Sequence, residues 1–362
     1  MKNYITTIDK YVTNQYLKVF TFLTVLFFIL RVLILVFEDL KAVVTYEAST
    51  QSAIAYFLYS SPALLSEIIP VVMLISTIFV FHRLGKNGEI IGIMGTGASL
   101  IRIAVPIIIT GLLMSVALWV WDEVFAAEMK SRAHIIMKYE IKEDQITRIK
   151  TGGIWMQGRS GRFFFIRAVD YDDDILYDMK VFQMDEKHEN LISLLSASEA
   201  DISTSEWKLT SGTSTIFDGT MVKSYNFEQH TSPFPETMRD LEDTQKAPER
   251  MSYSELKRYL EILESAGIKS NRYLTELHIK NAFPLSALIM SVWGIILCMK
   301  VREGMTIEIG SAILCLLGYF GLMAFCQDLG YKGILSPWFA AWFPNIVFLA
   351  GAAIGLLRRY TY

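Results

Sequence analysis

The sequence is short of the residues from which several common kinds of site are built. Its 362 residues include only 3 cysteines, and none of them forms a CxxC or Cys/His spacing, which excludes a disulfide scaffold and a zinc module. The chain has no GxxxxGK[ST] phosphate loop and no HExxH motif. The net charge of −3 gives no support for nucleic-acid binding. We therefore expect that this chain is not an enzyme and that it has neither a cofactor nor a metal site.

Charge is also scarce, and it is unevenly distributed. Charged residues make up 20% of the chain against 52% hydrophobic residues, and the mean hydropathy is +0.34. Residues 125–280 hold 21 Lys or Arg and 26 Asp or Glu, so this segment is about 30% charged, whereas the rest is about 12% charged. The flanks are typical of membrane segments, and the middle is typical of a water-soluble domain.

The weakly charged flanks contain six apolar runs. Roughly 20 apolar residues in a helix span the hydrocarbon core of a bilayer. The runs are Val19–Phe37, Phe57–Phe81, Ile103–Trp121, Asn281–Met299, Ile309–Gln327 and Gly333–Leu357. One such run could be a buried core helix, but six of them favour membrane spans. We predict three spans, a large insertion and three more spans.

Basic residues in the short loops predict the orientation, because Lys and Arg gather on the cytoplasmic side. One set of loops holds ten of them, whereas the opposite short loops hold only Lys41 and Lys332. The ten are Lys2, Lys10, Lys18, Arg83, Lys86, Arg102, Lys300, Arg302, Arg358 and Arg359. Both termini are therefore expected in the cytoplasm and the insertion outside. Met1–Lys18 is either a short interfacial helix, with Tyr4 and Tyr11 on its apolar side, or an ordinary tail.

The insertion has the pattern of short strands with turn signals. Gly153–Gln157 and Arg162–Val169, joined by a Gly-Arg-Ser-Gly turn, predict a hairpin. Further strands are expected at Asp178–Met184, Leu191–Ile202, Glu206–Leu209 and Met221–Phe227. Several such strands suggest a sandwich or jelly roll. The acidic cluster Asp172–Asp174 lacks the spacing of a calcium loop, so a solvated turn is favoured. The predicted fold class is an α-helical six-span membrane domain with an inserted extracytoplasmic all-β, jellyroll-like domain.

A helix with clear end signals follows the strands. Ser252 and Glu255 form the S-x-x-E pattern of a capping box, Leu256 and Leu260 belong to one apolar stripe, and Gly267 is a natural stop. A second helix, from about Ser270, should run into the fourth span. The predicted domains are 1–124, with three spans and a cytoplasmic loop at 82–102, then 125–250, the β domain, and 251–362, with linker helices and three spans.

The loop at 82–102 is the candidate site for a cytoplasmic partner. A short helix beginning near Asn87 would place Ile90, Ile91 and Met94 on one apolar side. Glu89 would lie in the first turn, free to meet a basic partner. The loop is either such a coupling segment or a plain re-entry turn. The cytoplasmic segments are too small for an ATPase domain, so energised transport needs a separate energy source.

Arg31 is the other outlier, because it lies within an apolar run. Ionisable groups at membrane depth usually face a cavity or a partner. Arg31 could meet an anionic lipid head group or a phosphate, or it could pair with Glu38 or Glu67. The sequence leaves these alternatives open.

Several stretches, taken in their order and spacing, resemble one family. They are Asp9-Lys-Tyr11, the loop with Glu89 and Gly97, Gly153-Ile-Trp155, Met251-Ser-x-x-Glu-Leu-x-x-Tyr259 followed by Glu276, Lys280 and Pro284, and Trp342-Phe-Pro344. With these, the sequence resembles the lipopolysaccharide export permeases (YjgP/YjgQ, or LptF/LptG) over nearly its whole length. It is more similar to the G member than to the F member.

The resemblance implies a function and a set of partners. It implies the permease subunit of an ABC transporter in the bacterial inner membrane, which extracts lipopolysaccharide and passes it to a periplasmic bridge toward the outer membrane. The implied partners are a homologous LptF-like permease, a cytoplasmic LptB-like ABC ATPase dimer, a single-span LptC-like bridge protein and lipopolysaccharide. A secondary transporter, an envelope receptor with a ligand-sensing periplasmic domain and a scaffold are the alternatives.

The resemblance also implies roles for single residues. Glu89 matches the family's acidic residue at the ATPase, and the loop at 82–102 becomes the coupling segment. Lys41 matches a basic position at the periplasmic end of the first helix. Lys130 and Arg132, just beyond the third span, are candidates for the acidic sugar-phosphate head, or else plain surface charges. Arg31 lies one turn before a family lysine that is apolar here, near Leu35.

Overall fold

The computed structural model describes most of the chain and divides it into two compact units. The described residues are 7–142, 150–158, 162–170, 173–185, 191–204, 206–218, 221–236, 247–265, 269–298 and 305–357. The helical unit comprises Met1–Met137, Pro248–Leu260 and Ser270–Tyr362, and the β unit comprises Lys138–Ala247 and Glu261–Lys269. Sequence features that lie outside the described residues are Lys2, Tyr4, the turn residues 159–161, Asp172, Gly267, Met299, Lys300, Arg302, Arg358 and Arg359.

Within the described residues, six helical segments are long and apolar enough to cross a membrane, as predicted. They are α1 (Thr7–Thr45), α2 (Thr50–Lys86), α4 (Leu100–Trp121) with its continuation, α8 (Asn271–Ala282) running into α9 (Ser286–Cys298), α10 (Met305–Tyr331) and α11 (Pro337–Leu357). The continuation of α4 is a π-helical turn, η1 (Asp122–Ala126), followed by α5 (Ala127–Ile135) and η2 (Ile136–Ile141). A 3-10 turn, η4 (Phe283–Leu285), joins α8 to α9.

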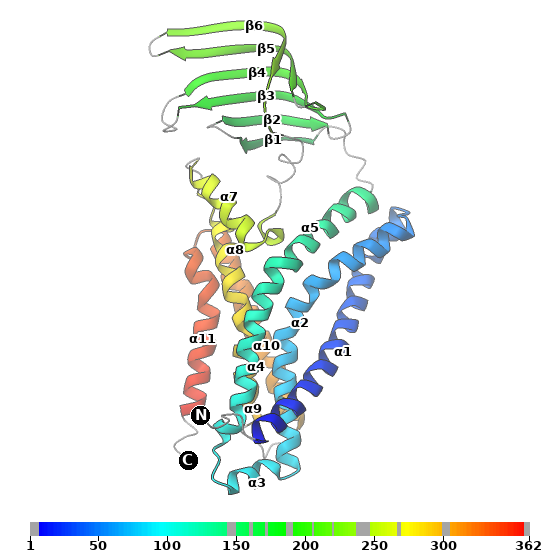
Figure 1. Cartoon of the computed structure of the whole chain (residues 1–362), viewed down its shortest axis with the longest axis vertical. Helices are drawn as coiled ribbons and strands as arrows, with labels where there is room; N and C mark the ends of the chain where they lie inside the picture. Colours follow the sequence, from blue (N-terminus) through cyan, green and yellow to red (C-terminus); the bar gives the residue numbers. More distant parts are fainter. Residues whose placement is uncertain are drawn as a thin grey trace. The chain divides into compact units, whose positions relative to one another are not determined.

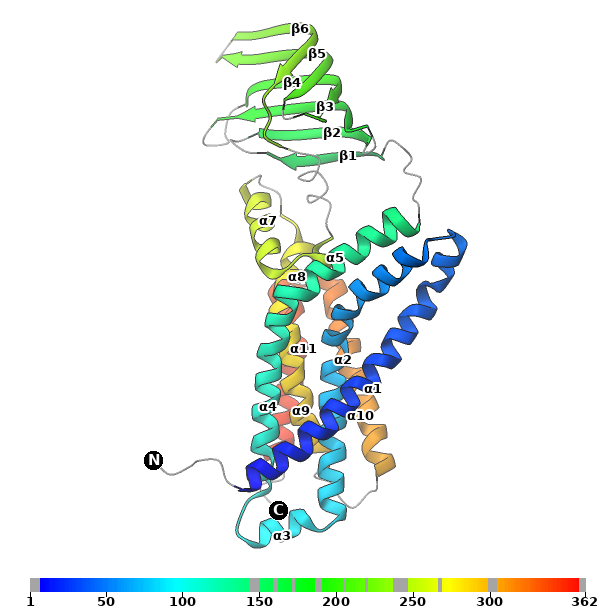
Figure 2. The ribbon, with the colours of Figure 1, turned by 45° about the vertical axis from the view of Figure 1, so that its right-hand side comes forward.

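The helices run up and down, so that consecutive turns lie at opposite ends of the helical unit (Figure 1). The start of α1, the end of α11 and the short helix α3 (Glu89–Gly95) lie at one end. The end of α1, the start of α2 and α5 lie at the other end (Figure 2). Of the residues expected to form an interfacial helix or a tail, 7–18 form the first turns of α1, where Val12 and Tyr16 are buried.

Helices α2 and α9 form the centre of the helical unit, and small residues let them approach each other closely. A Cβ atom on Gly294 of α9 would lie 2.6 Å from Cβ of Thr77 in α2. Around this pair, α1 packs on α2, and α4 and α11 pack on α9. Close contact of small residues is a common way to pack helices where lipid offers no hydrophobic driving force.

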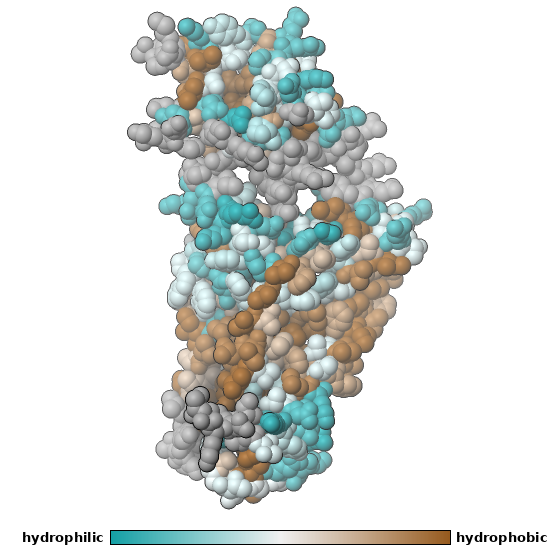
Figure 3. Space-filling view, viewed as in Figure 1, coloured by the Kyte–Doolittle hydropathy of each residue, from teal (hydrophilic) through white to brown (hydrophobic). Residues whose placement is uncertain are grey.

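The surface of the helical unit has the distribution of a membrane protein. Figure 3 shows a hydrophobic band across the helices, with hydrophilic surface at both ends of this unit. Large apolar side chains of the membrane-length helices are exposed, among them Phe22 at 67% and Phe37 at 74% on α1, and Leu314 at 72% on α10. Exposed apolar area of this extent is stable when lipid or another protein covers it.

The β unit contains one antiparallel sheet in which neighbours in sequence are neighbours in space. Its strands are β1 (Lys150–Gln157), β2 (Arg162–Asp170), β3 (Ile175–Met184), β4 (Leu191–Asp201), β5 (Trp207–Asp218) and β6 (Met221–Ser232), in the order β1-β2-β3-β4-β5-β6. The all-β character of the insertion is confirmed, and so is the first hairpin. The described strands form a consecutive meander, a detail that alternation within single strands cannot reveal.

One face of this sheet is apolar, and it becomes more exposed toward β6. The register aligns Phe164, Val181, Leu195, Ser214 and Tyr225 in one row across the strands. Phe164 is fully buried and Val181 is 3% exposed, whereas Tyr225 on the last strand is 58% exposed. Side chains on one face alternate with those on the other along each strand, so this row lies on a single face, which is mostly apolar, is interrupted by Ser214 on β5 and is exposed at β6.

An aromatic cluster of Phe164, Trp207 and Phe234 is buried against the sheet. Trp207 is buried at 1% exposure, and its ring lies 5.4 Å from that of Phe164 and 5.2 Å from that of Phe234. The indole Nε1 of Trp207 donates to the backbone oxygen of Glu236 at 3.0 Å. A buried indole needs such an acceptor, so this contact fixes the segment after β6 against the sheet.

Candidate functional site

The short helix α3 lies at one end of the helical unit, between the second and third spans. Gly88 precedes it with φ of +73°, a backbone conformation that favours glycine. Glu89 occupies its first turn, as the sequence predicted. The helix is expected to begin there because Glu89 is favoured beside the partial positive charge of a helix N terminus.

Glu89 is held in place by two hydrogen bonds, so it is not a free side chain. The Tyr11 hydroxyl donates to Glu89 Oε2 at 2.8 Å, and Asn87 Nδ2 donates to Glu89 Oε1 at 3.0 Å. The pKa of Glu89 lies below its usual value, because the hydrogen bonds from Asn87 and Tyr11 stabilise the carboxylate. The carboxylate therefore stays charged and points in a defined direction.

The apolar residues of α3 divide between the core and the surface. Ile90 is 7% exposed and belongs to the main apolar core of the helical unit. Ile91 is 74% exposed and Met94 is 46% exposed. Positions three apart lie on the same side of a helix, so Ile91 and Met94 form a small outward apolar surface beside Glu89. Ile90 anchors the helix from the inner side.

The first turns of α1 provide a second attachment for this end of the molecule. Arg102, near the start of α4, forms two hydrogen bonds with the Asp9 carboxylate, at 2.6 and 2.7 Å. Paired contacts of this kind are among the strongest polar interactions in proteins. Together with the bond from Tyr11 to Glu89, they tie α1 to both α3 and α4. Asp9 and Tyr11 were not identified from the sequence as site residues, because 93 and 78 positions separate them from their partners.

Arg31 pairs with both Glu38 and Glu67, the two partners that the sequence left open. Its guanidinium lies 3.4 Å from Glu38 in its own helix and 3.4 Å from Glu67 in α2. The side chains of Glu38 and Glu67 are 58% and 52% exposed. Long contacts between exposed partners contribute little to stability, and a guanidinium has five N–H donors.

The other basic candidates lie at the end of the helical unit opposite to α3. Lys41 is exposed near the end of α1, and Lys130 is exposed on α5. Arg132, also exposed on α5, pairs with Glu128 at 2.6 Å and lies 5.9 Å above the ring of Tyr59 in α2. Helices α1 and α5 both pack against α2. The four basic residues are therefore distributed over two helices that share one neighbour.

In the described ranges, no group of three His, Cys, Asp or Glu side chains is arranged to hold a metal ion. The polar features are instead attachments between helices and exposed charges. Such an arrangement suits binding and movement of the helices.

Six apolar helices interrupted by an antiparallel sheet define a multi-pass membrane protein with a folded β insertion. The family model described as lipopolysaccharide export system permease LptF/LptG matches residues 10–359, and the chain belongs to this family. The protein is thus a lipopolysaccharide export permease, from a family of transport proteins, and its β unit fits a periplasmic domain. No curated protein matches the chain in a sequence search. The family model covers both members, so the greater likeness to LptG stays a prediction.

Proposed function

We propose that this permease is the LptG-like membrane subunit of an ABC transporter in the bacterial inner membrane. It extracts lipopolysaccharide from that membrane and delivers it to a periplasmic bridge toward the outer membrane. The observation that carries the proposal is α3, a short helix with a fixed acidic side chain and an outward apolar surface in a permease of this family. The excess of basic residues on one side supports cytoplasmic termini and a periplasmic insertion.

Energy enters through α3 in this proposal. A cytoplasmic ABC ATPase dimer, LptB-like, binds the surface made by Glu89, Ile91 and Met94, while Ile90 fixes the helix from within. Movement of α3 passes to α1 through Tyr11 and to α4 through the chain itself. The bond from Tyr11 to Glu89 and the paired contact between Asp9 and Arg102 support this transmission.

The cargo is held by charge and by apolar surface. Arg31, Lys41, Lys130 and Arg132 contact the acidic sugar-phosphate head, since guanidinium and ammonium groups bind phosphate well. The acyl chains lie between this permease and a homologous LptF-like partner. The exposed apolar side chains of α1 support such a surface.

The β unit then receives the lipid. The apolar face that opens toward β6 supports a role in shielding acyl chains from water, because burial of each methylene group contributes roughly 0.8 kcal/mol. A single-span LptC-like protein continues the path. The domain roles follow the predicted division: residues 1–124 couple to the ATPase and carry Arg31 and Lys41, residues 125–250 carry Lys130, Arg132 and the sheet that receives lipid, and residues 251–362 complete the membrane bundle.

The Glu89→Lys variant tests the proposed function. Reversing the charge at a position that faces a basic partner should weaken ATPase binding or separate ATP hydrolysis from transport. We expect reduced co-purification of the ATPase, or normal hydrolysis with little transfer of labelled lipopolysaccharide from proteoliposomes. Both quantities are measured on the complex with the partner permease and the ATPase.

Glu228→Lys is the matched control, because Glu228 is an exposed glutamate on β6 and the change of charge is the same. It should leave ATPase binding unchanged. Normal ATPase binding together with normal lipid transfer in Glu89→Lys would overturn the coupling role. A wild-type complex with neither a bound ATPase nor bound lipid would favour a scaffold.

A further inference from the structure

The first turn of α7 (Tyr253–Ser265) is unusual in how completely its amide groups are paired. The first N–H groups of a helix have no partner within the helix. Here Ser252 N donates to Glu255 Oε2 at 2.9 Å, and Glu255 N donates to Ser252 Oγ at 3.2 Å. The capping box predicted from the sequence is thus confirmed, and it satisfies two of these groups.

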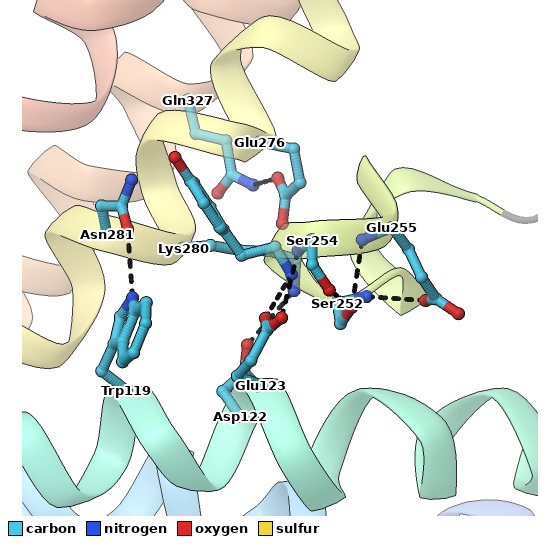
Figure 4. A network of polar contacts seen from close by, with 11 residues as sticks. Trp119, Asp122, Glu123, Ser252, Ser254, Glu255, Glu276, Lys280, Asn281 and Gln327 are labelled. Atoms are coloured by element: carbon cyan, nitrogen blue, oxygen red, sulfur yellow. Dashed lines mark hydrogen bonds and ion pairs between the residues drawn. The ribbon is translucent and has the colours of Figure 1, made fainter. Parts of the chain in front are cut away.

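The side chain of Glu123, which is distant in the sequence, accepts hydrogen bonds from the two backbone N–H groups between Ser252 and Glu255. Tyr253 N donates to Glu123 Oε2 at 2.7 Å, and Ser254 N donates to Glu123 Oε1 at 3.2 Å. Glu123 lies in the π-helical turn η1, at the end of the third span and 130 positions before Tyr253. Figure 4 shows the Glu123 carboxylate reaching from this helix to the start of α7.

The residues around Glu123 bind the neighbouring helix α8. Lys280 pairs with Asp122 at 3.2 Å, and its side chain is only 8% exposed. Trp119 Nε1 donates to Asn281 Oδ1 at 3.1 Å. Figure 4 shows Trp119, Asp122 and Glu123 side by side on one helix, facing α7 and α8. Asp122 meets a cation, whereas Glu123 meets the positive end of a helix dipole.

These contacts join the two places where the chain passes between the spans and the insertion. The chain leaves the third span through η1 and α5, and it returns through α7 and α8 to the fourth span. Helix α4 continues directly into η1, and α3 precedes α4 by a turn of four residues, Thr96–Ser99. A displacement of α3 would therefore pass through this short turn and then along α4 and η1, which form one continuous helical segment, to Glu123.

We propose that Glu123 is a positioning residue for transport, which transmits movement of the third span to α7 by holding its first turn. This inference rests on the proposed function, because it assumes that α3 is moved by an ATPase. Glu123 acts on the segment that returns from the β insertion, and it does not bind ATPase or lipid itself. Its loss should leave hydrolysis intact and reduce the lipid moved for each ATP consumed.

The test compares Glu123→Ala with Glu140→Ala in the full chain, assembled with the partner permease and the ATPase in proteoliposomes. Glu140 is an exposed carboxylate in η2, farther along the segment that follows the third span. Hydrogen exchange is followed in peptides that cover residues 252–258. Transfer of labelled lipopolysaccharide and ATP hydrolysis are measured on the same preparations.

We expect faster exchange in these peptides and a several-fold loss of lipid transferred per ATP in Glu123→Ala, with ATPase binding unchanged. Glu140→Ala should behave as wild type in both measurements. Unchanged hydrogen exchange in Glu123→Ala would show that the contact from Glu123 does not hold the first turn of α7. Faster exchange with wild-type transfer per ATP would show that the contact is structural only, and either result overturns the proposal.

A conservative variant keeps the test decisive if Glu123→Ala does not fold. Glu123→Gln retains one acceptor oxygen and loses the charge, so it should show a smaller loss of transfer per ATP in a folded protein. Wild-type transfer per ATP in Glu123→Gln, combined with faster exchange, overturns the proposal. Failure of the proposed function looks different, because the wild-type complex itself would then show no ATP-dependent lipid transfer.

Discussion

Tyr11 attaches the short helix α3 to α1, in addition to the peptide bonds that connect α3 to the chain on either side. Its hydroxyl fixes the carboxylate of Glu89, which the sequence suggested would be free, and so sets the direction in which the charge points. A fixed charge has already lost the conformational freedom that binding would otherwise remove. The surface of α3 that we propose for ATPase binding is thus positioned by a side chain of α1.

The Tyr11→Phe variant tests this role at the ATPase contact. The hydroxyl helps to lower the pKa of Glu89, so its removal should raise that pKa toward the usual value for glutamate. A carboxylate with a lowered pKa stays charged until the pH falls further. ATPase binding should therefore be lost at a higher pH in Tyr11→Phe than in wild type when the solution is acidified.

The measurement is co-purification of the ATPase across a pH series. Tyr46→Phe serves as the control, because Tyr46 is an exposed tyrosine in the turn after α1 at the opposite end of the helical unit. Identical pH profiles for wild type and Tyr11→Phe would contradict a positioning role for Tyr11.

Arg31 has two possible roles, ion pairing with Glu38 and Glu67 or binding of lipid phosphate, and variants can separate them. Arg31→Met should reduce the lipopolysaccharide phosphate that co-purifies with the complex, since a guanidinium can bind phosphate beside two weak carboxylate contacts. The double variant Arg31→Met/Glu67→Gln removes the carboxylate left behind. It should remain as poor in bound phosphate as the single variant. Recovery of bound lipid in the double variant would assign Arg31 to internal pairing.

At the scale of elements, the contact between α2 and α9 sets how closely the central helices approach. Gly294→Ala would place Cβ 2.6 Å from Thr77 Cβ and 3.0 Å from the backbone oxygen of Leu74. Overpacking of this kind costs about 1–3 kcal/mol. We expect a lower Tm for Gly294→Ala in detergent. Gly321→Ala on α10 is the control, because its Cβ would meet nothing within 4 Å, and an equal Tm for both variants would contradict the packing argument.

Elements were predictable where the signal is local. The apolar runs, the capping box at Ser252 and the first hairpin depend on residues close in sequence, and all are found in the structure. Strand β5 was expected at Glu206–Leu209 but extends to Asp218. Its second half, with Ser211, Gly212 and Thr213, lacks an alternating apolar pattern, so pairing with β4 and β6 defines it.

For the whole molecule, the sequence predicted the order of the spans and the insertion, but it did not predict which helices contact each other. The contacts from Tyr11 to Glu89, Asp9 to Arg102 and Glu123 to Tyr253 cross 78, 93 and 130 positions. A pattern of hydropathy reveals which face of a helix is buried, but not which helix covers it. The short helix α3 with Glu89 in its first turn was predicted from the sequence, whereas its attachments required the three-dimensional structure.

The length of α1 has a consequence for the membrane itself. Its 39 residues make a helix about 58 Å long at 1.5 Å per residue, nearly twice the roughly 30 Å of a hydrocarbon core. Figure 2 shows that α1 runs obliquely beside the steeper helices. A long helix responds to bilayer thickness by changing its tilt. Because Tyr11 attaches one end of α1 to α3, a change of tilt would move the other end, with Lys41, relative to α5, and we expect the spacing between Lys41 and α5 to change with lipid chain length.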